Sequence, residues 1–323
     1  MPSPPADDPI DVVYTWVDDG WPGYRELLGR HASSRHDLNP NRTRDNLQTL
    51  KYSLRSLAAF APWVRRVYLV TCRPQAPSWL NASVVRVVHH DEFMPRDHLP
   101  TFNSFAIVSN LHRLPDLARR FVYVEDDRVF GRAVGADDFF DEAGRVRVYE
   151  ALRGTPGGDA RSGHASPWNL ALAYSNALLD ARFGRRSRRQ LKFAPLAVDR
   201  DRWIEMIDAW PEAFARTSAS RFRAARNVAP EHLYPHFALA AGHGVRVPPL
   251  TMARHAWYQP LNNVLPLQAI GMARLRWFAP KFACLNDNFG ARPHDSAVRV
   301  VRRALERWFP SPSPFEVADG SYV

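Results

Sequence analysis

Cysteine is scarce in this sequence: Cys72 and Cys284 are the only two among 323 residues. They lie far apart and each sits in an apolar stretch, which excludes a disulfide framework and a zinc site of cysteines and predicts two buried, reduced thiols. Long apolar runs are also missing, since none approaches the ~18 to 20 residues that a membrane-spanning helix needs. Residues 1–10, MPSPPADDPI, lack the basic and apolar regions of a secretory signal, so we interpret them as a leader and expect a cytoplasmic protein.

Acidic residues are outnumbered, with 33 Asp and Glu against 43 Lys and Arg, which gives a net charge of +10. Such a balance favours polyanionic partners, namely phosphates, nucleic acid, acidic glycans or an anionic membrane face. Arginine and alanine richness is also typical of a GC-rich genome, so the charge by itself assigns no function. Because the second half shows no recognition motif for nucleic acid, we expect no nucleic-acid partner.

Buried strands alternate with amphipathic helices over the first part of the chain. Apolar, β-rich runs predict strands over 11–17, 65–72, 83–90 and 121–127. Helical spacing predicts helices over 45–60 and from Asn103 or Ser104, as N-cap, to about Pro115. This alternation predicts an α/β fold with a largely parallel sheet and helices on both faces. Ligands bind at the carboxyl ends of such strands, where Asp18, Asp126 and Asp127 fall.

The second half has a different character. After the α/β core of 11–150, a Gly/Pro-rich stretch precedes a mainly helical part, 151–292, expected to complete the active site. A basic amphipathic helix follows within 293–310, with Val298, Val301, Leu305 and Trp308 on one face. Its apolar face suits peripheral contact with the inner face of the membrane, or packing on the core or on another subunit, which we favour. Residues 311–323 are predicted to be a disordered tail.

Asp126 and Asp127 form a carboxylate pair at the end of a buried strand, in the segment FVYVEDD. Two such charges raise each other's pKa and lose hydration unless something neutralises them. A divalent cation is the usual remedy, and Mg²⁺ or Mn²⁺ would join carboxylate oxygens to the diphosphate of a nucleotide sugar. For an isolated pair, a turn or helix cap with solvated carboxylates is the more common explanation.

Longer motifs surround the pair and occur in a fixed order. They are DVVYTWVD, then RDN with LKYSLRSLAAFAPWVRRVYLVT and WLN, then LPTFNSFAI, LHRLPDL and FVYVEDDRVFGR, and finally CLNDN. In order they resemble the conserved blocks of the Stealth family of sugar-phosphate transferases, which includes bacterial capsule polysaccharide enzymes and the catalytic subunit of the lysosomal N-acetylglucosamine-1-phosphotransferase. The resemblance covers most of the chain and is densest over 11–140.

The resemblance implies a glycosyltransferase-A-like (Rossmann-like) nucleotide-binding fold. It implies transfer of a hexose or N-acetylhexosamine 1-phosphate from a nucleotide sugar, foremost a UDP-sugar, to a glycan hydroxyl of a capsular or cell-surface polysaccharide. Nucleoside monophosphate would be released. By position, Asp127 and Asp287 would hold Mg²⁺ or Mn²⁺ with Asp126 beside them, and Arg223 would clamp phosphate. The substrate-binding residues implied by the matching motifs are Asp18, Asp45, Asn46, Asn103, Arg113 and Asn288.

Three positions depart from the family pattern. Phe193 stands where the family has a histidine that is a candidate general base, Val108 replaces a glutamate, and Asn227 replaces an aspartate. None of the three can do the work of the residue it replaces. Either another residue serves as the base (His112, His232, His236 or Lys192), or this member binds nucleotide sugar or glycan without catalysis. Besides the sugar-phosphate transferase and the non-catalytic binding protein, a third hypothesis is an ordinary glycosyltransferase that releases nucleoside diphosphate.

Overall fold

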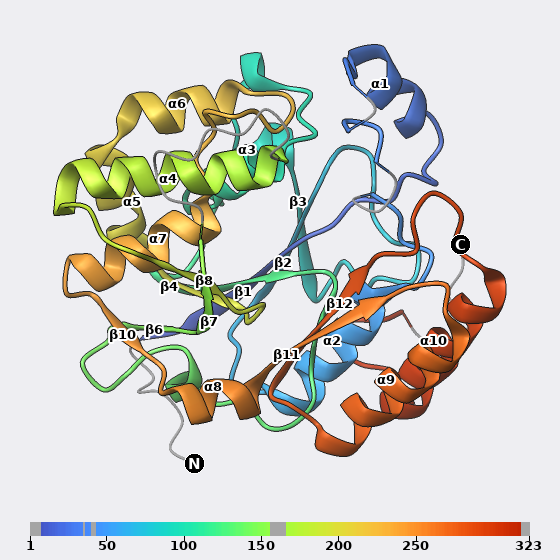
Figure 1. Ribbon diagram of the computed structural model, residues 1–323. Coiled ribbons are helices and arrows are strands. Elements are labelled where there is room, and N and C mark those ends of the chain that lie inside the picture. The colour runs from blue at the N-terminus through green and yellow to red at the C-terminus, as the bar shows by residue number, and fades with distance from the viewer. Residues whose placement is uncertain (1–7, 35, 40–42, 156–165, 318–323) are drawn as a thin grey trace.

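A computed structural model describes residues 8–34, 36–39, 43–155 and 166–317. The predicted leader therefore lies outside the described residues for 1–7, and the predicted tail lies outside them for 318–323. Figure 1 shows a central sheet with the helices α4 to α7 on one side and α9 and α10 on the other.

The central sheet has the strand order β3-β2-β1-β4-β9 within the described residues. Strands β1 (Ile10–Thr15), β2 (Val67–Thr71), β3 (Val85–His89) and β4 (Arg120–Glu125) run parallel, and β9 (Leu196–Asp199) pairs antiparallel with β4. The strands β1, β2 and β4 are buried almost throughout, as expected for a parallel sheet covered on both faces. The predicted α/β class with a mostly parallel sheet is confirmed.

Helix α2 (Thr49–Phe60) packs on this sheet through Leu50, Leu54 and Leu57, and the hydroxyls of Tyr14 and Ser53 lie 2.9 Å apart. It begins four residues later than predicted, because Gln48 adopts a left-handed conformation with φ 54°. The residues before it form a turn. Helix α3 (Ser104–Ser109) has the predicted cap, since the side chain of Asn103 accepts a hydrogen bond from the Phe105 N–H. It ends early, in a 3₁₀ turn over Leu111–Arg113.

The second half is largely helical, as predicted. Its helices are α4 (Pro167–Phe183), α5 (Arg200–Ala209), α6 (Pro211–Ala219), α7 (Pro230–Ala240), α8 (Pro249–His255) and α9 (Leu265–Phe278). The prediction missed its strands. The short strands β7 (Glu150–Gly154) and β8 (Arg189–Leu191) pair with each other, as do β6 (Val146–Val148) and β10 (Gly244–Arg246). Because β9 joins the central sheet, the two halves share one core.

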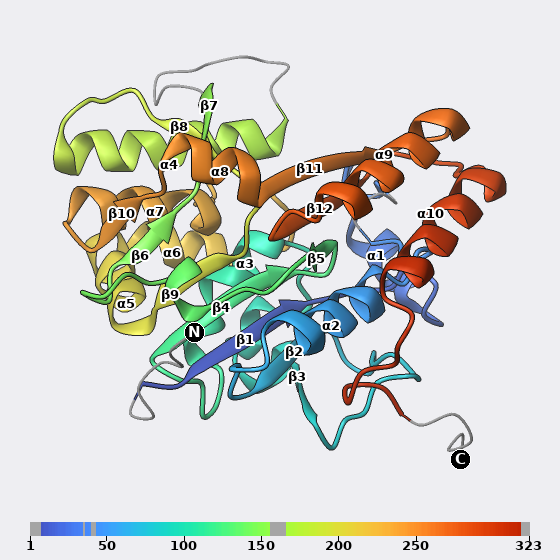
Figure 2. The same ribbon diagram turned by 90° about the horizontal axis from the view of Figure 1, so that it is seen from below.

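A smaller sheet lies beside the first. Strand β5 (Arg128–Phe130) follows β4 directly, leaves the central sheet and pairs antiparallel with β12 (Phe282–Asp287), which pairs parallel with β11 (Ala256–Leu261) (Figure 2). This sheet brings the CLNDN segment next to the end of β4. Helix α1 (Tyr24–His31) lies after β1 on the same edge of the central sheet (Figure 1).

Helix α10 (Asp295–Trp308) buries Ala297, Val301 and Leu305 against α9 and the smaller sheet. Packing on the core, the favoured interpretation, is thus confirmed for its apolar face. No helix in the described part of the chain is both long and apolar enough to cross a membrane.

The predicted disorder from residue 311 is wrong for the part that is described. The carboxylate of Glu316 accepts hydrogen bonds from the guanidinium of Arg55 at 2.7 to 3.2 Å, and the Val317 N–H donates to the Trp79 carbonyl. Glu316 neutralises the guanidinium of Arg55, whose side chain is only 10% exposed. This ion pair holds the segment on α2.

Candidate active site

The carboxyl ends of β1, β4 and β12 meet around a pocket of about 480 Å³. We call it the carboxylate pocket, because Asp126, Asp127 and Asp287 line it together with Arg44 and Arg223. Strands β1 and β4 are parallel neighbours, so their ends lie at one edge of the sheet, where ligands of open α/β sheets bind. The sequence prediction placed the site at this edge.

Asp126 and Asp127 occupy the turn between β4 and β5. Burial raises the pKa of Asp126 well above its ordinary range, and the nearby charges of Asp127 and Asp45 raise it further. Burial also raises the pKa of Asp127 to about 6, although the Cys284 thiol donates a hydrogen bond to its Oδ2 at 3.3 Å. The pair is thus charged only at a cost, as expected where a cation is to bind.

Asp127 has one free coordination position. Within the described residues its Oδ1 is buried and has no hydrogen-bond partner. No group of three or more His, Cys, Asp or Glu side chains in this part of the chain is arranged to hold a metal ion. The buried, unpartnered Oδ1 of Asp127 fits a cation such as Mg²⁺, which takes one or two protein carboxylates and completes its shell with phosphate oxygens and water.

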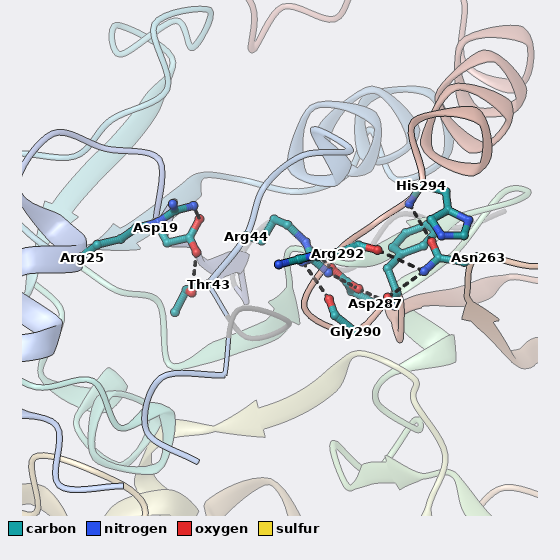
Figure 3. Close-up of polar contacts among 10 residues, drawn as sticks. Asp19, Arg25, Thr43, Arg44, Asn263, Asp287, Gly290, Arg292 and His294 are labelled. Atoms are coloured by element: carbon teal, nitrogen blue, oxygen red, sulfur yellow. Dashed lines mark hydrogen bonds and ion pairs between the residues drawn. The ribbon is translucent and has the colours of Figure 1, made fainter. Parts of the chain in front are cut away.

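Asp287 lies in the same pocket but is held by Arg44. The Arg44 Nη2 lies 2.7 Å from Oδ1 and 2.6 Å from Oδ2 of Asp287, and its Nη1 donates to the Gly290 carbonyl at 3.0 Å (Figure 3). The Phe289 N–H donates to Asp287 Oδ1 as well. Both Asp287 oxygens are thus engaged by a cationic side chain, and the implied joint ligation by Asp127 and Asp287 stays a prediction.

Arg223 lines the carboxylate pocket, as the phosphate-clamp role requires. Its guanidinium lies 4.7 Å from the ring centre of Phe105 and 5.4 Å from that of Trp168, and its Nη2 donates to the Ser104 hydroxyl at 2.5 Å. The rings hold the planar guanidinium in one orientation.

Asp45 and Asp18 do not line the pocket, so the structure does not support them as direct substrate contacts. Asp45 instead accepts a hydrogen bond from Trp16 Nε1 at 3.0 Å, and Trp16 does line the pocket. Burial raises the pKa of Asp45 to about 7, and the charge of Asp18 adds to this. Asp18 Oδ1 accepts from the Gly20 N–H at 2.8 Å and closes the turn after β1.

Asn103 and Arg113, predicted to bind substrate, do not line the carboxylate pocket. Asn103 is fully buried, and its Nδ2 donates to the Ser220 and Phe222 carbonyls and to Asn227 Oδ1. It holds the segment that carries Arg223. Arg113 is exposed just before β4 begins, because α3 runs back toward the amino ends of the strands. It therefore lies at the opposite edge of the sheet.

Asn46 and Asn288 do line the carboxylate pocket, so their substrate-binding role stays a prediction. Asn288 Nδ2 donates to the Tyr258 hydroxyl at 3.3 Å. Lys192 lies elsewhere, in an adjoining pocket of about 170 Å³ that we call the side pocket. The two pockets share the four lining residues Tyr123, Glu125, Trp168 and Phe193.

Phe193 stands between the two pockets, where the family has its histidine. Its ring stacks on Tyr258 at 4.7 Å and lies 5.5 Å from the Arg128 guanidinium, which also donates to the Phe193 carbonyl at 3.0 Å. The ring thus fills the position of a base without any group that takes a proton. The other two departures are structural: Val108 is buried in the core, and Asn227 donates to Ser220 Oγ and accepts from the Ala224 N–H.

The histidines proposed as substitute bases are engaged elsewhere. His112 lines neither pocket, and burial lowers its pKa to about 4. His236 Nε2 lies 3.0 Å from the Arg189 carbonyl, and burial lowers its pKa to about 4 as well. His232 lines the side pocket, but its Nε2 lies 2.9 Å from Asn176 Oδ1 and burial lowers its pKa well below the ordinary range.

The sequence reasoning missed Arg44, Trp16 and Glu231. Arg44 is the first residue of the RDN motif, and its position in that motif could have identified it. Trp16 belongs to the DVVYTWVD motif at the end of β1. Glu231 gave no signal, because an acid in the first turn of a helix is common.

Known families and proteins match the chain over most of its length. Three models of the Stealth protein match in order: conserved region 2 over residues 42–148, conserved region 3 over 194–240 and conserved region 4 over 273–321.

Three curated relatives are named exopolysaccharide phosphotransferases. The exopolysaccharide phosphotransferase SCO6021 of Streptomyces coelicolor is 35% identical over 96% of this chain and 58% of its own length. The exopolysaccharide phosphotransferase of Nocardia farcinica is 36% identical over 95% of this chain and 61% of its own, and CpsY of Mycobacterium tuberculosis is 34% identical over 95% and 58%. The chain therefore spans little more than half the length of these relatives.

Among solved structures, the galactosyltransferase LgtC in complex with donor and acceptor sugar analogs is 10% identical, with a TM-score of 0.41 over 96% of this chain and 98% of that one. Mouse xyloside xylosyltransferase 1 is also 10% identical, with a TM-score of 0.41 over 86% and 97%.

Proposed function

Because this chain belongs to the Stealth family, we propose that it transfers a hexose or N-acetylhexosamine 1-phosphate from a nucleotide sugar to a glycan hydroxyl. The product would be a phosphodiester in a surface polysaccharide, and the released product a nucleoside monophosphate. The names of the relatives, exopolysaccharide phosphotransferases, support a transfer of this type. We expect the reaction in the cytoplasm, with a UDP-sugar as the donor.

One observation carries the proposal: a carboxylate pair and two arginines line one pocket. A diphosphate needs cationic groups on its oxygens, and Arg44 and Arg223, which line the pocket, would supply them. When bound, Mg²⁺ or Mn²⁺ would neutralise further charge on the transferred phosphate and on the leaving group. Asp127 would hold it, joined by Asp287 once the incoming phosphates draw Arg44 away.

Trp16, Tyr24, Phe102 and Phe222 are among the aromatic side chains that line the carboxylate pocket, and such side chains suit a nucleobase. Phe102 stacks on Phe222 at 5.2 Å, Tyr24 meets Phe102 edge-on at 5.9 Å, and Trp16 is oriented by Asp45. A base can stack on such faces whatever its identity. The pocket lining thus offers aromatic faces for the base and charged groups for the diphosphate.

The test is product analysis. The protein is incubated with Mg²⁺ or Mn²⁺, an acceptor glycan and a panel of nucleotide sugars, and the nucleotide released is identified. Monophosphate supports the proposal, whereas diphosphate would make the protein an ordinary glycosyltransferase. Asp127→Ala should abolish release, while Asp97→Ala, at a side chain 84% exposed on the surface, should not change it.

A second candidate is a relative that binds nucleotide sugar without turning it over. Phe193 at the base position favours it. In that case nucleotide sugar would quench the fluorescence of the pocket tryptophans Trp16 and Trp168, and no nucleotide would be released with any acceptor.

A further inference from the structure

The side pocket opens off the carboxylate pocket at the point where Phe193 stands. Tyr149, Trp168, Lys192 and Glu231 line it, together with Arg128 and Gln190. Aromatic faces with a few polar groups are what sugar rings bind. A hydroxyl held in the side pocket would face the carboxylate pair across the lining that the two pockets share.

Of the two acids that line the side pocket, Glu125 is ion-paired with Arg128, and Glu231 is the other. It is the second residue of α7, directly after Pro230, and its Oε2 is buried without a hydrogen-bond partner among the described residues. An unpartnered buried carboxylate oxygen is costly and calls for a donor. The described structure supplies none, whereas an acceptor hydroxyl in the side pocket would.

The surroundings of Glu231 suit proton transfer. Burial raises its pKa, while the positive charges of Arg223 and Arg128 limit the increase. A carboxyl so raised is a better base than an exposed one near neutral pH. His232 beside it is a poorer choice, because its Nε2 is engaged by Asn176.

We propose that the side pocket binds the acceptor sugar and that Glu231 takes the proton from its attacking hydroxyl, in place of the histidine that Phe193 replaces. The assignment rests on the proposed function. The hydroxyl oxygen forms a bond to the phosphorus that carries the sugar, and its proton moves to Glu231 Oε2. The bond from that phosphorus to the bridging oxygen breaks, the electron pair leaves with the nucleoside monophosphate, and Glu231 later returns the proton to solvent.

The experiment compares Glu231→Gln with a matched control, Glu212→Gln. Glu212 has the same local position, second in α6 directly after Pro211, but is exposed to solvent. Glutamine keeps the shape of the side chain and cannot take up the proton. We expect Glu231→Gln to lower kcat at least ~100-fold, the usual contribution of a general base, with unchanged donor binding by tryptophan quenching. Glu212→Gln should behave as wild type.

A second variant separates catalysis from structure. Phe193→His in the Glu231→Gln background should restore part of the lost turnover, because it returns a base to the mouth of the side pocket. The assignment is overturned if Glu231→Gln turns over as fast as Glu212→Gln, or if it loses donor binding and turnover together. Absence of monophosphate release by the wild-type protein would instead overturn the proposed function itself, and this assignment with it.

Discussion

Replacing Asp127 with Asn should stabilise the metal-free protein and abolish cation binding at once. The pKa of Asp127 rises from 3.8 to about 6 on folding because of burial, which corresponds to about 2 to 3 kcal/mol against the charged form at neutral pH. Asparagine removes that cost and also removes the charge that raises the pKa of Asp126. Because a buried amide still loses hydration, we expect a net gain of ~1 to 2 kcal/mol in the free energy of unfolding.

The pH dependence follows from the direction of this change. A carboxyl whose pKa is higher in the folded protein than in the unfolded chain binds its proton more tightly when folded. The cost is therefore absent below the unfolded value of 3.8, grows as the pH rises from 3.8 to about 6, and is complete at pH 8. The advantage of the variant should be largest at pH 8 and smaller at pH 5.5.

The assay is urea denaturation in the presence of EDTA at both pH values, with Mn²⁺ binding measured by calorimetry at pH 8. Asp97→Asn serves as the control, because Asp97 is 84% exposed and its replacement should leave stability and cation binding unchanged. The reasoning is refuted if Asp127→Asn is less stable than wild type at pH 8 in EDTA. Unchanged Mn²⁺ affinity would equally remove Asp127 as a ligand.

Two further changes test the pocket wall and the packing of α10. Arg44→Gln should lower the free energy of unfolding in EDTA by ~1 to 3 kcal/mol, because the half-buried Asp287 loses its partner. It should also raise Mn²⁺ affinity by calorimetry, with Arg73→Gln, at an exposed ion pair, as the control; unchanged affinity would argue against Asp287 as a ligand. Leu305→Ala should cost ~2 to 5 kcal/mol in urea denaturation, since Leu305 is fully buried, whereas Leu267→Ala, 54% exposed, should cost little. A small cost at Leu305 would contradict core packing of α10.

Local patterns predicted the elements that depend on nearby residues. The buried strands β1 to β4 and helix α2 appear within a few residues of their predicted bounds, because apolar periodicity reports which face of an element is covered. The late start of helix α2 goes with a contact to a residue far from the helix in the sequence. Asp45, predicted to be helical, is held by Trp16 from the end of β1.

The strands that the sequence did not predict also depend on residues far away in the chain. The short strand β9 has no strong pattern of its own and exists because β4 offers it an edge. Its antiparallel direction follows from the path of the chain through the helices before it. Strand β12 likewise forms by pairing with β5 and β11, which come from distant parts of the sequence.

The sequence by itself determined that Asp126 and Asp127 end a buried strand at a ligand-binding edge, and that the ordered motifs around them are those of one family. Only the tertiary structure decided that Asp287 is paired with Arg44, that Asn103 is a support within the fold, and that Glu231 lies in a pocket beside Phe193. The physical reason is that a strand end is a local property. Which charges share one low-dielectric pocket depends on contacts between residues up to 243 positions apart.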